Sequence, residues 1–250
     1  MVADPRSLAS PSMLTARSVA ARRERVFFGG MTIALFVAVL VGFGPSYYFR
    51  TVTGSPVELT PALHVHGIVF TAWMVLLVVQ SSLVAAGRTA VHRRLGAAGA
   101  GLAVAMIALG AYVPISRFQA GLIDAPPGIP ASALMAIALA SIVVFPVLFG
   151  AALLLRQRTD YHKRLVLLAT LELATAAIAR WPGVLAYGPP LFFALTDLFL
   201  VAIAVYDFRT RGRLHPATLW GGLFLIASQP LRLVVGTSAA WTSFAASLTG

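Results

Sequence analysis

The sequence predicts an all-α membrane protein, a polytopic bundle of seven transmembrane helices with its N-terminus cytoplasmic and its C-terminus outside. Three observations predict this class. First, 59% of the 250 residues are hydrophobic and 11% are charged, more apolar surface than a water-soluble core of this size can bury. Second, seven stretches provide the roughly 20 apolar residues that a helix needs to cross a bilayer. Third, basic residues alternate between the two ends of these stretches.

Short connections rich in Pro, Gly and Arg join the seven stretches and leave no room for a folded extramembrane domain. We expect the helices at residues 26–49, 62–86, 94–114, 131–155, 162–182, 190–207 and 216–236.

The seven-helix transmembrane domain therefore covers 26–236, between an N-terminal cytoplasmic tail at 1–25 and an outer interfacial tail at 237–250. The first stretch is too long for a cleaved signal peptide and is interpreted as a retained anchor. The longest connection, about 115–130, contains several prolines and is expected to be non-helical.

The net charge of +11 would suggest a nucleic-acid partner in a soluble protein. Here the basic residues gather at one side of the spans, which is typical of membrane topology, so we expect no nucleic-acid partner. The predicted partner is the lipid bilayer, and the preference for Arg over the single Lys163 is typical of a GC-rich bacterial genome, which indicates a bacterial inner membrane. Cysteine is absent, which excludes disulfides and thiolate metal sites. No phosphate-binding loop, metalloprotease motif or nucleophile elbow is present.

Three turns at the cytoplasmic side contain an arginine followed four residues later by a histidine. They read GRTAVHRRLG (87–96), QRTDYHKRLV (157–166) and TRGRLHPATL (210–219). The histidines, His92, His162 and His215, each begin an apolar span at one membrane boundary. Three imidazoles with an open fourth position suit zinc, and two on facing helices suit haem iron. The alternative is that these histidines cap helix amides or meet lipid headgroups.

His66, Trp73 and Gln80 recur every seven residues in the second span and therefore share one helix face. A polar side chain in hydrocarbon is costly, so His66 and Gln80 are expected to have protein partners or to line a cavity. For His66, the alternative is a plain hydrogen bond to a carbonyl group.

Glu172 and Asp197 are predicted near mid-membrane, about ten residues inside their spans. They are candidate proton or cation groups. The alternative is an ion pair that joins helices, in which Asp197 pairs with Arg180 or Arg232.

The segments LHVHGIVFTAWMVLLVVQ (63–80), VHRRLG (91–96) and DYHKRL (160–165) resemble a family of uncharacterised bacterial multi-pass membrane proteins. More loosely, the chain resembles the transmembrane b-type cytochromes, in which paired histidines ligate one haem near each membrane face. Only His64 and His66 are available at the outer side here, and they are neighbours on one helix. The resemblance therefore implies at most one haem, held by two of the three inner histidines.

Two functions follow from these residues. The first is a redox-associated protein that binds haem b or a divalent metal through His92, His162 and His215, with His66 as a further cofactor-binding candidate. The second is a small-solute or proton-coupled carrier, or an accessory subunit of a membrane complex, that uses Glu172 and Asp197. A bundle without any site, a homo-oligomer and a membrane-complex partner remain open at this point, as does enzyme status.

Overall fold

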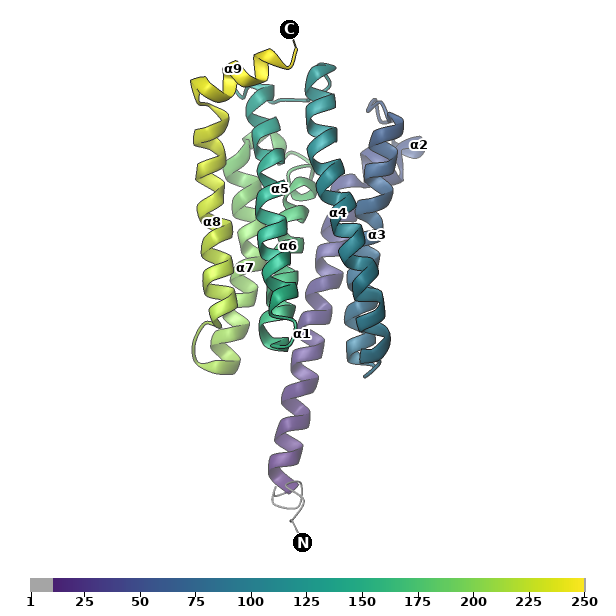
Figure 1. Ribbon diagram of the computed structural model, residues 1–250, viewed down its shortest axis with the longest axis vertical. Helices are drawn as coiled ribbons and strands as arrows, with labels where there is room; N and C mark the ends of the chain where they lie inside the picture. Colours follow the sequence, from purple (N-terminus) through teal and green to yellow (C-terminus); the bar gives the residue numbers. More distant parts are fainter. Residues whose placement is uncertain (1–10, 250) are drawn as a thin grey trace.

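The computed structural model describes residues 11–249, and all regular structure within them is helical. Long helices run side by side along one axis, and the N-terminal helix projects beyond the others (Figure 1). The elements are α1 (Pro11–Phe43), the π-helix η2 (Gly44–Tyr48), α2 (Arg50–Thr53), α3 (Pro61–Ala85), α4 (Thr89–Gln119), α5 (Ala131–Leu154), α6 (Thr159–Ile178), the 3₁₀-helix η3 (Leu185–Tyr187), α7 (Pro189–Arg211), α8 (Pro216–Gly236) and α9 (Ala239–Ser247).

Six of these helices are long and apolar enough to cross a membrane, with mean hydropathies between 1.3 and 2.6. They are Ser18–Tyr48, which comprises most of α1 together with η2, and α3, α4, α5, α7 and α8. The chain is thus an all-helical, multi-pass membrane protein. Many large apolar side chains on the outer surfaces of these helices remain exposed in the isolated chain, where lipid would cover them.

Helix α6 corresponds to the fifth predicted stretch and lies inside the bundle. Its sequence carries Asp160, Lys163, Arg164 and Glu172, which lowers its mean hydropathy relative to the other long helices. Helices α1, α5, α7 and α8 all pack against α6, and most of its residues from Arg164 onward are buried. A helix with four charged residues is tolerated here because its neighbours supply polar partners and shield it from lipid.

Close packing of α1 against α6 depends on a glycine. A Cβ atom added at Gly42 would overlap the backbone carbonyl of Ala177. The missing side chain lets the two backbones approach, as small residues commonly do between membrane helices.

Several predicted boundaries differ from the observed ones, and two of the differences change the expected connections. Helix α1 begins at Pro11, so the described part of the expected tail is helical, while residues 1–10 lie outside the described residues. Helix α4 continues through Pro114 to Gln119, although we expected a loop from about residue 115. A proline inside a membrane helix is tolerated where neighbouring groups satisfy the freed carbonyl. The connection between α4 and α5 is therefore shorter than predicted.

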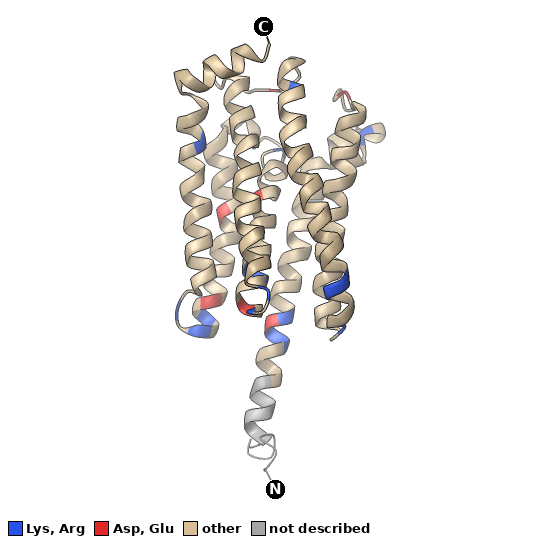
Figure 2. Ribbon diagram, in the orientation of Figure 1, with Lys and Arg blue, Asp and Glu red and all other residues tan. Residues whose placement is uncertain are grey.

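The two ends of the bundle differ in charge (Figure 2). We call the end formed by the α3–α4, α5–α6 and α7–α8 connections the basic end, because most Lys and Arg residues lie there. Helix α9 lies across the opposite end (Figure 1), where Trp241 Nε1 donates a hydrogen bond of 2.8 Å to the carbonyl of Ser132.

Candidate functional site

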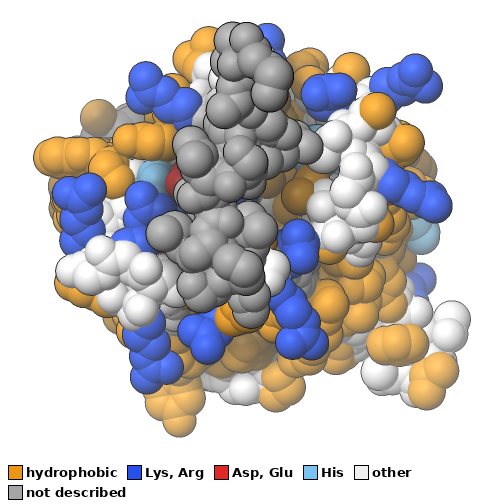
Figure 3. All heavy atoms as spheres, turned by 90° about the horizontal axis from the view of Figure 1, so that it is seen from below, with side chains coloured by type: hydrophobic (Ala, Val, Ile, Leu, Met, Phe, Trp, Pro, Cys, Tyr) orange, Lys and Arg blue, Asp and Glu red, His pale blue; other side chains and the backbone are white. Residues whose placement is uncertain are grey.

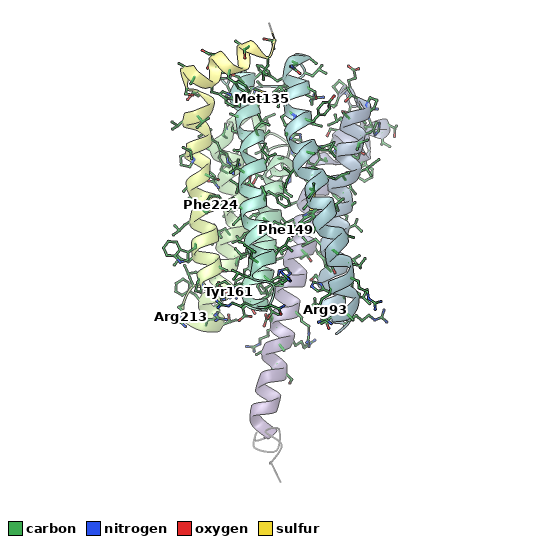
Figure 4. The ribbon with its side chains drawn as sticks, viewed as in Figure 1. Arg93, Met135, Phe149, Tyr161, Arg213 and Phe224 are labelled. Carbon is green, nitrogen blue, oxygen red and sulfur yellow. The ribbon has the colours of Figure 1, made fainter. Side chains whose placement is uncertain are left out.

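Two of the predicted histidines meet inside the basic end of the bundle. His92 lies in the first turn of α4 and His162 in the first turn of α6. Their ring centroids are 6.3 Å apart and the ring planes are nearly perpendicular, at 83°. The neighbouring residues Arg93 and Tyr161 mark this level in Figure 4. We call His92 and His162 the histidine pair.

A backbone carbonyl orients the ring of His162. The Nδ1 atom lies 2.9 Å from the carbonyl oxygen of Ala152 in α5. Because a carbonyl oxygen can only accept, Nδ1 carries the proton in this bond, which leaves Nε2 with its lone pair. Metal-binding histidines are commonly held in this way through their second nitrogen.

His92 is positioned by the neighbouring helix α3. Gln80 Nε2 donates a hydrogen bond of 3.1 Å to the backbone carbonyl of His92. The Nδ1 atom of His92 and the Oε1 atom of Gln80 are both buried and have no hydrogen-bond partner among the described residues. Buried polar atoms are nearly always paired with protein, water or a bound group. These two atoms can therefore bind a ligand or an ordered water molecule.

The third inner histidine, His215, does not join the pair. Its Nδ1 accepts a hydrogen bond of 3.1 Å from the backbone of Ala217, and it is the N-cap of α8. Its ring packs against Tyr161, with centroids 4.6 Å apart. Tyr161 and His162 are adjacent on α6 and so project about 100° apart. One directs contacts toward His215 and the other toward His92.

The sequence predicts three histidines around one ion, whereas the structure groups only two. Within residues 11–249, no group of three or more His, Asp or Glu side chains is close enough to hold a metal ion. His215 instead has the alternative role, because it caps the first turn of α8.

A buried ion pair between Arg164 and Asp207 lies beside His215, and the sequence patterns do not predict it. Arg164 Nε donates to Asp207 Oδ1 at 3.0 Å, and the two side chains are 2% and 0% exposed. Asp207 Oδ2 also accepts hydrogen bonds from Thr218 at 2.6 Å and from the backbone of His215 at 3.1 Å. This carboxylate therefore joins α6, α7 and α8. The sequence offers little signal for this pair, because Arg164 lies only two residues inside the predicted span at 162–182, next to the basic Lys163 of the same turn.

Near the middle of the bundle, Glu172 pairs with Arg232 at 2.8 Å, and both side chains are buried. Ser141 donates a further hydrogen bond of 2.7 Å to Glu172. Asp197, for which an ion pair with Arg180 or Arg232 was the alternative to a proton or cation group, accepts a hydrogen bond of 2.8 Å from Gln229. Arg232 reaches Glu172 because both face the interior between α6 and α8. The ion pair that joins helices is thus present, with a different carboxylate.

The remaining predicted residues lie toward the opposite end. Arg180 follows the last turn of α6, donates to the Ala176 carbonyl at 2.6 Å and places its guanidinium 5.0 Å from the centre of the Phe43 ring. His66 stacks on Phe70 with centroids 4.1 Å apart. Its Nδ1 atom is buried and has no hydrogen-bond partner among the described residues. His66 is therefore not part of the histidine pair.

The ring of His215 is expected to make stability depend on pH. Burial lowers its pKa from 6.5 to about 4, and the nearby Arg164 and Arg211 add to this effect. Between pH 6.5 and about 4 the unfolded chain binds a proton that the folded chain does not, so His215 costs up to about 3 kcal/mol of stability as the pH falls. Thermal unfolding at pH 8 and pH 5 measures this loss. His215→Asn keeps a capping side chain without a titratable group and should lose less stability between pH 8 and pH 5. An identical pH dependence in both proteins would show that His215 is not the group responsible.

Comparisons of the chain with protein-family models, with curated proteins and with solved structures give no match.

Proposed function

We propose that this chain is a seven-span protein of the bacterial inner membrane that binds one metal centre between His92 and His162 and takes part in electron transfer. The observation that carries the proposal is the 6.3 Å separation of the two ring centroids. The basic end is then cytoplasmic, in keeping with the positive-inside rule, and the histidine pair lies at the cytoplasmic boundary.

The separation of the rings fits two imidazoles that share one ion. A metal–imidazole bond is about 2 Å long. The centre of each five-membered ring lies about 1 Å behind its ligating nitrogen, so two rings on opposite sides of an ion have centroids about 6 Å apart. The hydrogen bond from His162 to the Ala152 carbonyl leaves Nε2 free as a ligand.

The small number of protein ligands favours haem iron over a single divalent ion. A zinc ion bound by protein takes three or four protein ligands, while the described residues bring only two imidazoles together and no carboxylate to the pair. Haem iron would need only two ligands from the protein, and His92 and His162 would supply them. The bound haem would supply one-electron transfer chemistry.

Helix α6 is the span that, added to the six apolar helices, makes seven. Its 20 residues correspond to about 30 Å of helix, the thickness of a bilayer core. Its charged side chains face other helices, since Arg164 pairs with Asp207 and Glu172 with Arg232. Seven spans place the two ends of the transmembrane region on opposite sides of the membrane.

An absorption spectrum and a metal analysis of the detergent-solubilised protein test the proposal. We expect a Soret band and about one iron per chain, both lost in His92→Ala and in His162→Ala, because each variant removes one of the two proposed ligands. His64→Ala, which alters an exposed histidine, is the matched control and should retain both. Stoichiometric zinc without a Soret band, lost in the same two variants, would identify a single ion at the pair. Absence of both signals, or equal loss in the control, would contradict a metal centre at this site.

A further inference from the structure

A groove lies between α1 and α3 near the basic end of the bundle and is separate from the histidine pair. Its cavity volume is about 90 Å³. The residues that matter for its chemistry are Arg25, Gly29 and Ile33 of α1 and Val78, Ser81 and Ser82 of α3. The groove thus combines a cation and hydroxyl groups with aliphatic side chains.

The polarity of the groove changes with depth. Glu24, next to Arg25 in the chain, forms an ion pair with Lys163 in the first turn of α6, so Arg25 lies at the level of the basic end. Ile33 is eight residues further along α1, about 12 Å closer to the middle of the bundle. Helix α3 runs in the opposite direction and repeats the order, with Ser82 at the boundary and Val78 deeper. One wall of the groove is therefore charged at the boundary and apolar inside, like a phospholipid.

Two polar groups of the groove, the Arg25 guanidinium and the Ser81 hydroxyl, are available to a ligand, whereas the Ser82 hydroxyl donates a hydrogen bond of 2.8 Å to the Val78 carbonyl. Among residues 18–249, Arg25 forms no ion pair or hydrogen bond through its guanidinium, and the hydroxyl of Ser81 has no hydrogen-bond partner. Gly29 lies opposite Ser81: a Cβ there would be in ordinary van der Waals contact, 3.7 Å from the Ser81 hydroxyl oxygen, so only a larger side chain would fill the groove. The basic end seen from below carries many other Lys and Arg side chains (Figure 3), which raises the local concentration of anions.

We propose that this groove binds the headgroup phosphate of an anionic phospholipid, with an acyl chain along Ile33 and Val78. A guanidinium is suited to phosphate because it offers several donors in one plane. Basic pockets between membrane helices on the cytoplasmic side bind the headgroups of anionic lipids. A free phosphate ion would use Arg25 and Ser81 but would gain nothing from the aliphatic wall.

Native mass spectrometry of the full-length protein, titrated with phosphatidylglycerol, tests the proposal. Arg25→Gln should weaken lipid binding about five-fold, the effect expected for one basic group near a membrane surface. Gly29→Leu should also weaken binding, because it fills the groove without changing the charge. Arg23→Gln is the matched control, because it removes the same charge from the same helix about 200° around the axis, and it should bind lipid within two-fold of the parent chain.

Two results would overturn the proposal. Equal weakening by Arg23→Gln and Arg25→Gln would show that the lipid responds only to net charge. Binding of inorganic phosphate at millimolar concentration with the same dependence on Arg25, but unaffected by Gly29→Leu, would identify a site for the free ion. Helical content and elution volume confirm that each variant folds. None of the variants alters His92 or His162, so the outcome is independent of the proposed metal centre.

Discussion

Replacement of Asp207 by alanine is expected to destabilise the protein by about 3–5 kcal/mol, the usual cost of removing one partner from a buried ion pair. The guanidinium of Arg164 would remain in the interior, 2% exposed, without a counter-charge. Thr218 and the backbone of His215 would also lose their acceptor. Thermal or denaturant unfolding of the protein in detergent micelles measures the effect.

Asp160 provides the matched control for this prediction. Its ion pairs with Lys163 and Arg211 are at 2.9 Å and 3.5 Å, and its side chain is 47% exposed. Asp160→Asn should therefore cost less than about 1 kcal/mol. Combining Asp207→Leu with Arg164→Met should restore part of the stability, because neither charge is then buried. Equal effects of Asp207→Ala and Asp160→Asn would mean that the buried pair contributes no more than a surface one.

Replacement of Glu172 by glutamine should also destabilise the bundle, by about 3 kcal/mol or more. Glutamine has nearly the same size and still accepts the hydrogen bond from Ser141, but it leaves Arg232 buried without an anion. The measurement is again unfolding in detergent, together with the yield of folded protein. The change separates charge from shape, since the side-chain volume is almost unaltered.

Asp197→Asn is the control for Glu172→Gln. The described residues give Asp197 no cationic partner, and asparagine can still accept the hydrogen bond from Gln229, so we expect a change within about 1 kcal/mol. A carrier that uses Glu172 as a proton group predicts the reverse pattern, in which Glu172→Gln folds normally and only uptake is lost. That result would contradict a structural role for the Glu172–Arg232 pair.

Part of the candidate site could be predicted before the fold was known. The repeated Arg-to-His turn indicates His92 and His162, and the cost of a polar residue in an apolar span indicates Gln80; the structure brings these three into one region. His215 shares the same turn pattern but caps α8, and its ring packs against Tyr161. An ion pair of Asp197 with Arg180 or Arg232 was one alternative, and the structure pairs Arg232 with Glu172 instead, since the depth of two residues is known from the sequence while the direction in which each faces is not.

The sequence by itself determined the number, order and approximate bounds of the long helices and the charge difference between the two ends. These properties depend on hydropathy and on charge summed over neighbouring residues, and they need no knowledge of other helices. Only the tertiary structure decided that α6 lies at the centre, that His92 faces His162, and that Arg164 meets Asp207 and Arg232 meets Glu172. Each of these depends on the rotation of a helix about its own axis, where one residue changes direction by about 100°, and that rotation is set by packing between helices.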